Sequence, residues 1–433
     1  MKLLSLSWGT FSIASAFQTP IINVRRSIKC EAYVDINEGS ERDIGSFNEW
    51  ANACGVQQAD GFQLTVTNEY PMDIGVMTNQ DLPAQTPVLF VPNNMILSSF
   101  GLMEELGRVE AAEQRLVSAK AAVHVPKFYL FLKILLEYDQ GDQSVWFLWL
   151  NSVPRYYANG SSMTPFCFDC LPPLAGYLAM NERIKFIQFY QALKYVDFIS
   201  DYIKQNKELC KWVFAVVYTR HFQTPDGDFK IVPMADMLNH GTETEAQVTF
   251  DEEGNCCVYT NYDIPAGSPI RISYGDPTNP SNLFAKYGFV DESSPATFCK
   301  IMINKPSQEL VNMGYDHSKM LFYKETGEVS EEVWDVLLYQ ILESDPAAQQ
   351  QLYYAHMNGD YATKQAMHEQ YYPQTHTALQ NHVDSFLLDL EKLQSKGIGK
   401  DVSQHPRLPL IMQHNEFVKE TFLKVSSQLR QYA

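Results

Sequence analysis

VPMADMLNH, residues 232–240, carries a short apolar run that ends in the polar pair Asn239 and His240. An ordinary strand does not need such a pair at its end. An asparagine side chain offers two donors and an acceptor, which is enough to read the hydrogen-bonding edge of an adenine. An Asn-His pair also commonly caps a turn, so this stretch must be interpreted together with its surroundings.

A second stretch, ISYGDPTNPSNLFAKYGF at residues 272–289, contains Tyr274 and Tyr287, each followed by a glycine. A glycine lets the backbone approach a neighbouring group closely because it has no side chain. Tyr-Gly pairs also end ordinary strands. Their order after VPMADMLNH, with WVFAVVYTRHF upstream at residues 212–222, indicates one composite site.

The residues around these stretches show the pattern of small sheets. Residues 247–250 and 256–259 flank the turn sequence Glu-Gly-Asn and predict a hairpin. DLPAQTPV at residues 81–88 is similar to DIPAGSPI at residues 263–270. Two such loops arise by chance, but the likeness also predicts that two strand blocks, far apart in the chain, belong to one β domain.

Apolar residues recur at helical spacing between the two strand blocks, for example over residues 128–135, and again after residue 300, for example over residues 383–390. A chain of 433 residues is too long for one ordinary core. The sequence therefore predicts an α+β protein. Its β domain of small sheets is interrupted by a helical insertion and followed by an all-α C-terminal domain.

The formal net charge of -18 argues against nucleic acid as a partner, because binding to phosphates requires a basic surface. An acidic surface attracts basic peptide segments, but it also simply keeps a soluble protein dispersed. Beyond the N-terminus we find no run of 18 uninterrupted apolar residues, so no membrane span is predicted. The sequence leaves the oligomeric state open.

The eight cysteines are dispersed along the chain and do not resemble a disulfide framework. Cys167 and Cys170 form a single CxxC without a second one at zinc-ribbon spacing, so we predict no metal site and leave a redox role open. Cys256 and Cys257 fall in an alternating run and are expected to face opposite sides of a strand.

The first 30 residues contain no acidic residue and include an apolar stretch that ends in Ala-Ser-Ala at residues 14–16. This pattern is typical of a signal peptide. The basic, hydroxylated segment that follows looks like a transit peptide. Together they resemble the bipartite presequences of algae with secondary plastids, and the implied address is the plastid stroma. Secretion is the alternative.

The chain resembles the SET-domain protein methyltransferases, specifically the subfamily typified by the Rubisco large-subunit lysine methyltransferase. The matching strings are WVFAVVYTRHF, MADMLNH, ISYG, NLFAKYGFVDE and, for the opening helix, FNEWANACG. The resemblance implies a SET β domain with a pseudoknot. It divides the chain into a signal peptide at 1–16, a transit peptide or linker at 17–43, SET parts at 44–99 and 212–299, a helical insert at 100–211 and a helical substrate-binding domain at 300–433.

The resemblance also implies roles for individual residues. Contacts to S-adenosylmethionine are implied for Ile74, Gly75, Arg220, Asn239, His240 and Phe298. Arg220 would meet the cofactor's carboxylate, where a guanidinium forms a bidentate pair. Positions lining the substrate pocket are Thr219, Asp236 and Tyr274. Tyr287 is similar to the tyrosine of the methyl-transfer channel and is the expected catalytic residue.

Such a site would activate a lysine on a protein substrate without a metal. A lysine ammonium is not a nucleophile, and an apolar, aromatic channel lowers its pKa by disfavouring the charge. Alignment of the neutral amine with the sulfonium methyl then supplies most of the rate. The family suggests the Rubisco large subunit or stromal aldolase as substrates. Methylation of another residue, such as histidine, remains an alternative.

One position departs from the family pattern. The family's first cofactor loop contains Gly-x-Gly, and the equivalent here is Asp73-Ile74-Gly75, which keeps only the second glycine. This puts cofactor binding in question. A catalytically degenerate SET protein that binds a partner through its C-terminal helices is therefore the alternative from a different functional class.

Overall fold

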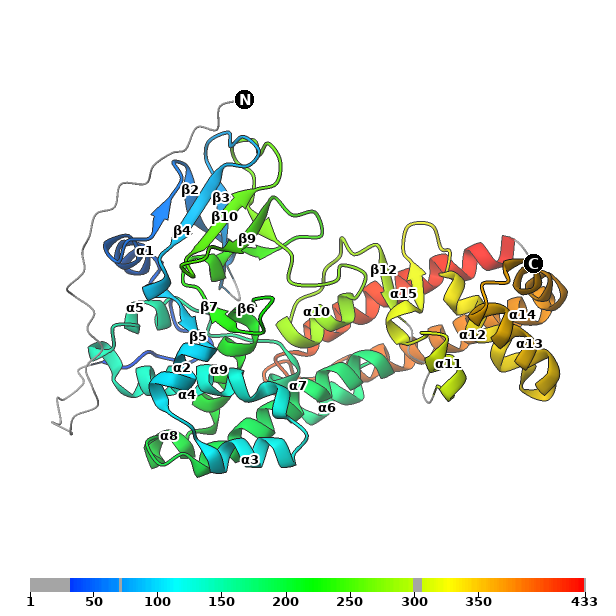
Figure 1. The fold of residues 1–433 in the computed structure, drawn as a ribbon, viewed down its shortest axis with the longest axis horizontal. Coiled ribbons are helices and arrows are strands. Elements are labelled where there is room, and N and C mark those ends of the chain that lie inside the picture. Colours follow the sequence, from blue (N-terminus) through cyan, green and yellow to red (C-terminus); the bar gives the residue numbers. More distant parts are fainter. Residues whose placement is uncertain (1–31, 70–71, 299–305, 432–433) are drawn as a thin grey trace.

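The computed structural model describes residues 32–69, 72–298 and 306–431, which form two lobes (Figure 1). The larger lobe contains small sheets above a layer of helices, and the C-terminal helices extend away from it as a second lobe. The predicted signal peptide and residues 17–31 of the predicted transit segment lie outside the described residues. No helix among the described residues is long and apolar enough to cross a membrane.

Short strands build five sheets in the described chain. A four-stranded sheet has the order β1 (Gln57–Gln58), β4 (Pro87–Val91), β10 (Cys256–Thr260), β9 (Ala246–Phe250). A three-stranded sheet has the order β5 (Leu97–Ser98), β7 (Phe229–Ile231), β6 (His221–Gln223). The three remaining pairs are β2 (Phe62–Glu69) with β3 (Met72–Thr78), β8 (Asn239–His240) with β11 (Arg271–Ile272), and β12 (Ala296–Phe298) with β13 (Leu321–Tyr323).

The predicted hairpin is confirmed as β9 and β10, which pair antiparallel with Cys256 opposite Phe250. Cys256 is buried and Cys257 is partly exposed, as expected of neighbours that point to opposite faces of a strand. Because β10 also pairs with β4, this sheet joins strands from both sides of the helical insertion.

The two similar segments at 81–88 and 263–270 pair with each other. The backbone N–H groups of Leu82 and Ile264 each donate to the other residue's carbonyl at 2.8 Å. Asp81 accepts from the backbone of Ala266 at 2.8 Å, and Asp263 accepts from the backbone of Ala84 at 2.7 Å. Each segment thus caps the other, which confirms that the two strand blocks form one β domain.

The helical insertion packs beneath these sheets. Its helices are α2 (Ser99–Leu106), α3 (Glu110–Ser118), α4 (Val125–Asp139), α5 (Phe147–Leu150), α6 (Pro165–Asp169), α7 (Pro173–Ala192), α8 (Asp201–Gln205) and the start of α9 (Lys207–Arg220). The predicted stripe on α4, Phe128, Phe131, Leu132 and Leu135, is fully buried. Helix α9 runs across the predicted boundary at 211–212 and carries the chain from the insertion back into the β domain.

The C-terminal lobe contains α11 (Gln308–Asn312), α12 (Glu331–Ile341), α13 (Pro346–Met357), α14 (Tyr361–Gly397) and α15 (Leu408–Gln431). The predicted apolar stripes of α14 and α15 form its core, in which Phe386 and Phe422 have ring centroids 4.5 Å apart. Between the lobes lies α10 (Pro280–Tyr287), which packs against α7 of the insertion.

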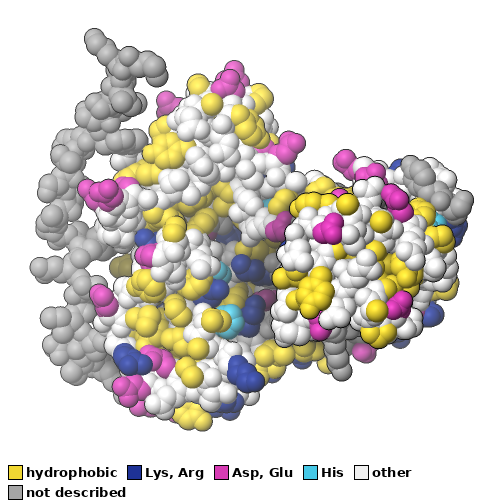
Figure 2. Space-filling model, turned by 45° about the vertical axis from the view of Figure 1, so that its right-hand side comes forward, with side chains coloured by type: hydrophobic (Ala, Val, Ile, Leu, Met, Phe, Trp, Pro, Cys, Tyr) yellow, Lys and Arg dark blue, Asp and Glu magenta, His cyan; other side chains and the backbone are white. Residues whose placement is uncertain are grey.

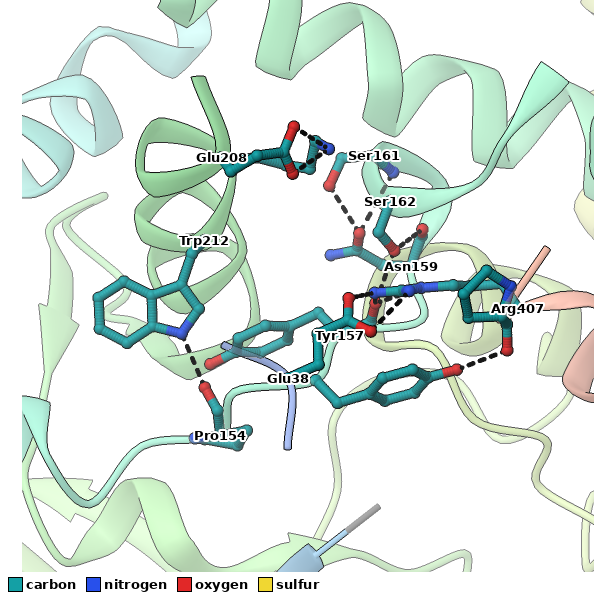
Figure 3. A network of polar contacts seen from close by, with 12 residues as sticks. Glu38, Pro154, Tyr157, Asn159, Ser161, Ser162, Glu208, Trp212 and Arg407 are labelled. Carbon is teal, nitrogen blue, oxygen red and sulfur yellow. Dashed lines mark hydrogen bonds and ion pairs between the residues drawn. The ribbon is translucent and has the colours of Figure 1, made fainter. Parts of the chain in front are cut away.

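The N-terminal segment ties the lobes together before α1 (Ile44–Ala53) begins (Figure 3). Arg407, which precedes α15, donates to the Tyr157 carbonyl from Nε at 3.0 Å and from a terminal nitrogen at 2.8 Å. The same guanidinium pairs with Glu38. Val34 is also buried. The folded body therefore begins before residue 44, because Val34 and Arg42 are buried in it, although most of residues 32–43 are exposed.

Candidate active site

A cavity of 790 Å³ lies in the larger lobe where α9 leads into β6. Five residues with predicted site roles line it: Thr219, Arg220, Asp236, Tyr274 and Tyr287. They come from the end of α9, the turn before β8, the segment after β11 and the end of α10. The fold thus collects into one cavity side chains that span 69 positions of the chain.

The two predicted tyrosines form an aromatic wall. Their ring centroids lie 4.7 Å apart. The Tyr274 hydroxyl donates to the Leu238 carbonyl at 2.6 Å, and the Tyr287 hydroxyl donates to the Tyr274 carbonyl at 3.4 Å. Burial raises the pKa of Tyr274 far above its ordinary value. The Tyr274 phenol is therefore a neutral hydrogen-bonding group at physiological pH.

Gly288 explains why a glycine follows Tyr287. Its φ of 82° lies in the left-handed region, and a Cβ there would lie 2.6 Å from the backbone carbon of Ala158. Gly288 therefore ends α10 and lets it approach the insertion. This contact holds Tyr287 at the cavity.

Arg220 and Asp236 form a buried pair on another side of the cavity. A terminal nitrogen of Arg220 lies 3.6 Å from Asp236 Oδ2 and also donates to the Asp236 carbonyl. Trp149 Nε1 donates to the same Oδ2 at 3.0 Å. Burial raises the pKa of Asp236, and the charge of Arg220 works against this shift.

The turn that holds Asp236 begins with strained backbone. Met234 has a φ of 72°, which is unusual for a residue with a side chain, and it is fully buried. The strain is held in place by this packing. Among the described residues, Nε of Arg220 and Oδ1 of Asp236 are buried without a hydrogen-bond partner. Unused buried polar atoms of this kind suit a site that receives a polar ligand.

A second group of predicted residues gathers where β3 lies beside β8. Asn239 Nδ2 donates to Asp73 Oδ2 at 3.0 Å, and the Thr67 hydroxyl donates to the same oxygen at 2.9 Å. A Cβ at Gly75 would lie 2.8 Å from Asn239 Nδ2. The retained glycine is therefore required by the close approach of Asn239. Ile74, which lies between Asp73 and Gly75 in β3, is buried.

Asp73 takes part in this arrangement. Its carboxylate satisfies a donor of Asn239, so the departure from Gly-x-Gly creates a hydrogen bond to the residue expected to read the cofactor. Strand β3 packs against the turn Ala235–Met237, which also carries Asp236. The two groups of predicted residues are therefore neighbours across one turn.

His240 does not line the cavity, but its ring lies 5.5 Å from that of Tyr274, between centroids. Its Nδ1 accepts from the backbone N–H of Tyr274 at 3.1 Å, which leaves Nε2 to donate to Asp291 at 3.3 Å. Burial works against ionisation of Asp291, but hydrogen bonds from His240, Ser293 and Thr242 hold its pKa well below the usual range. The His240 ring thus fixes the segment that carries Tyr274.

Phe298, the remaining predicted contact, is placed only by its backbone. It ends β12 and pairs with Leu321 of β13. Its side chain lies outside the described residues, as does Cys299.

Residues at the site that the sequence did not predict include Arg42, Trp149 and Lys286. Arg42 is buried and lies beside Arg220, since both guanidinium groups contact Met237 Sδ, at 3.8 and 3.7 Å. Burial and the charge of Arg220 lower the pKa of Arg42 to about 9. Arg42 and Trp149 reach the site only through the tertiary fold, whereas Lys286 stands directly before Tyr287 in the quoted motif NLFAKYGF.

The CxxC cysteines lie elsewhere. Cys167 and Cys170 are both fully buried and unpaired, and Cys167 Sγ accepts from the Thr164 hydroxyl at 3.2 Å. Within the described ranges, no three His, Cys, Asp or Glu side chains are placed to hold a metal ion.

Comparison with known proteins places the fold among SET domains. No family model matches the chain. SET domain-containing protein 8 of Schizosaccharomyces pombe is 27% identical over 105 residues, which cover 24% of this chain and 24% of that protein. The match thus spans about a quarter of the length of this curated relative.

Solved structures are similar over almost the whole chain. The SET domain of LSMT bound to lysine and AdoHcy has a TM-score of 0.60 at 14% identity and covers 90% of this chain and 91% of its own. Rubisco LSMT bound to AdoMet has a TM-score of 0.59 at 15% identity, with 90% and 92% covered. Rubisco LSMT bound to sinefungin and monomethyllysine has a TM-score of 0.61 at 16% identity, with the same coverage. The chain therefore has the SET fold of Rubisco LSMT, including a helical C-terminal region.

Proposed function

We propose that this chain is a protein-lysine N-methyltransferase that uses S-adenosylmethionine. The observation that carries the proposal is the cavity where Tyr274, Tyr287 and Asp236 meet, in a fold shared with structures described as bound to AdoMet, AdoHcy and lysine. The three positions are those that the motif resemblance assigns to the substrate pocket and transfer channel.

The described residues fit the cofactor. Gly75 lets Asn239 approach the backbone of β3 closely, so the amide that is expected to contact the cofactor is held beside this glycine. Arg220 keeps one buried donor unused, and Arg42 adds a second guanidinium beside it. Two neighbouring guanidinium groups suit a carboxylate. When bound, S-adenosylmethionine supplies an electrophilic methyl group on a sulfonium.

The chain's own residues would prepare the lysine. The aromatic wall of Tyr274 and Tyr287 disfavours an ammonium, so the target amine loses its proton to solvent before it reacts. The Tyr287 hydroxyl donates to the Tyr274 carbonyl and accepts from Lys286, which leaves one lone pair to accept from the amine N–H. This contact orients the nitrogen, and orientation supplies much of the rate of such a transfer.

We further propose that the chain acts in the plastid stroma on a substrate of the Rubisco large-subunit or aldolase type. The support is the bipartite presequence pattern in the first 30 residues and the match to Rubisco LSMT structures. The test uses labelled S-adenosylmethionine, the chain without residues 1–30 and a stromal extract, with the modified residue read by mass spectrometry. If the label is found on histidine, the histidine alternative replaces the lysine proposal. If no protein in the extract becomes labelled, the proposal is contradicted.

A non-catalytic protein-binding role has one specific observation in its favour. Asp73 engages the Asn239 amide that the cofactor would need, at 3.0 Å. Calorimetric titration with S-adenosylmethionine separates the two functions. The enzymatic function is supported if the unaltered chain binds S-adenosylmethionine and the Arg220→Gln variant binds it more weakly. The non-catalytic role is supported if the unaltered chain does not bind S-adenosylmethionine but the Asp73→Gly variant does.

A further inference from the structure

Three lysines gather beside the cavity, although the whole chain carries a net charge of -18. These lysines, which we call the lysine cluster, are Lys127 on α4, Lys185 on α7 and Lys286 on α10. The Nζ atoms of Lys127 and Lys185 lie 5.2 and 5.6 Å from the centroid of the same Tyr218 ring. Lys286 lines the cavity itself. Lys286 therefore brings the cluster to the cavity, whereas Lys127 and Lys185 are placed by the ring of Tyr218, one residue before Thr219 of the cavity wall.

The lysine cluster is poorly compensated. Lys185 pairs with Glu182, whereas the described chain shows no salt bridge for Lys127 or Lys286. Lys127 lies over the Phe229 ring at 4.2 Å, and Lys286 donates to the Tyr287 hydroxyl at 2.8 Å. Burial and the charges of the other two lysines lower the pKa of Lys127 to about 7. The three lysine charges therefore repel one another, and a nearby anion would offset this repulsion.

Polar groups around the cluster also lack partners. Among the described residues, the Tyr218 hydroxyl and His124 Nδ1 are buried without a hydrogen-bond partner. Tyr218 is 2% exposed. Burial and the lysines keep the pKa of His124 near 4, so this histidine is neutral at physiological pH. In Figure 2, Lys, Arg and His side chains gather in the hollow between the two lobes, while acidic side chains are scattered over the outer surfaces.

We propose that the lysine cluster selects substrates whose target residue is flanked by aspartate or glutamate. This inference rests on the proposed function, because it names the substrate class of the same cavity. Carboxylates on the substrate would meet Lys127, Lys185 and Lys286 while the target side chain enters beside Tyr287. The overall acidity of the chain opposes binding of acidic proteins at its outer surfaces, so productive encounters are directed to this hollow.

An acidic protein segment fits better than nucleic acid. A nucleic acid strand would carry phosphates well beyond the cluster and across the acidic outer surfaces, where they are repelled. A peptide carries its carboxylates only at chosen positions. The compact set of three lysines therefore matches a few carboxylates near one target residue.

The test measures binding of two fluorescent peptides to the full chain by anisotropy, with and without S-adenosylmethionine. The peptides share one central lysine, which is flanked by glutamate in one and by glutamine in the other. We expect the glutamate peptide to bind about tenfold more tightly at low salt, because a few partly buried charge pairs together contribute at least 1.4 kcal/mol. The difference should shrink as salt is added.

Matched variants assign the preference to the cluster. Lys127→Gln should remove most of the preference, and Lys127→Arg should retain it. Lys392→Gln is the control, since it makes the same charge change at an exposed lysine paired with Asp389. Thermal unfolding checks that each variant is folded, and Lys185→Gln provides a second test should Lys127→Gln fail to fold.

Equal binding of the two peptides to the unaltered chain would overturn the inference, as would a preference that survives both Lys127→Gln and Lys185→Gln. Stronger competition by single-stranded DNA than by the glutamate peptide would overturn it in favour of a nucleic acid. These outcomes do not depend on catalysis. If the chain prefers the glutamate peptide but transfers no methyl group, only the proposed function is contradicted.

Discussion

Gly75→Ala tests the part of the site that the structure defines most sharply. The new Cβ would lie 2.8 Å from Asn239 Nδ2 and 2.9 Å from Thr67 Cγ2. Both distances are well inside ordinary van der Waals contact, so one of these side chains must move. Each of them donates a hydrogen bond to Asp73, and the movement therefore breaks at least one of these bonds.

The size of the effect follows from these contacts. Insertion of a methyl group into a packed site costs about 1–3 kcal/mol of the free energy of unfolding. Displacement of the Asn239 amide by even a few tenths of an ångström would remove the hydrogen bond that we propose it makes to the cofactor. Loss of about 1.4 kcal/mol corresponds to a tenfold weaker Kd. We therefore expect a lower unfolding temperature and at least tenfold weaker binding of S-adenosylmethionine.

The assay pairs thermal unfolding with calorimetric titration. Gly45→Ala is the control, because its Cβ would meet nothing closer than Asp43 Oδ1 at 3.9 Å. Adding Asn239→Ala to Gly75→Ala should recover only part of the stability, because the contact with Thr67 Cγ2 remains, and should not recover cofactor binding. If Gly75→Ala unfolds and binds like Gly45→Ala, the close approach at β3 does not shape the cofactor site.

Three further perturbations give separable results. Tyr287→Phe should cut turnover about 10²-fold, because the hydroxyl that orients the amine is lost, while the calorimetric Kd for S-adenosylmethionine stays unchanged. Arg407→Ala should lower the free energy of unfolding by about 2 kcal/mol in denaturant titration, through loss of the bonds to Tyr157 and Glu38. Lys127→Met should flatten the rise of stability between pH 7 and 10.5, since the folded chain releases this proton near pH 7 and the unfolded chain keeps it to 10.5.

Each of these three has its own control. Tyr262→Phe alters a more exposed tyrosine outside the cavity and should leave turnover unchanged. Arg430→Ala removes an exposed pair with Asp384 and should cost no more than about 0.5 kcal/mol. Between pH 7 and 10.5 the unfolded chain holds a proton on Lys127 that the folded chain has released. A rise in pH therefore disfavours the unfolded state, and the free energy of unfolding increases. A stability curve of Lys127→Met that parallels the unaltered chain would contradict the account of its pKa.

Sequence patterns could predict the elements and much of the site because these depend on local chemistry. The buried stripe at 128–135 and the hairpin of β9 and β10 follow from periodicity alone. Tyr274, Tyr287 and Asp236 were assigned to one pocket from motifs, and the structure brings them to one cavity. Their catalytic and binding roles remain predictions.

Other parts of the site arise only from contacts between distant segments. Arg42 stands 178 positions before Arg220, and no local pattern shows that both reach Met237. The expected effect of Asp73 was also incomplete, since a sequence shows the loss of a glycine but not the new bond to Asn239.

The sequence by itself determined the SET motifs, the interrupted β domain and the helical C-terminal region, because spacing and periodicity are properties of neighbouring residues. Only the tertiary structure decided that three polar residues of VPMADMLNH contact different parts of the site. Asp236 lines the cavity and accepts from Trp149. Asn239 donates to Asp73 of β3, and His240 accepts from the backbone of Tyr274. The physical reason is that strained backbone at Met234 and the pairing of β8 with β11 turn successive side chains toward different partners.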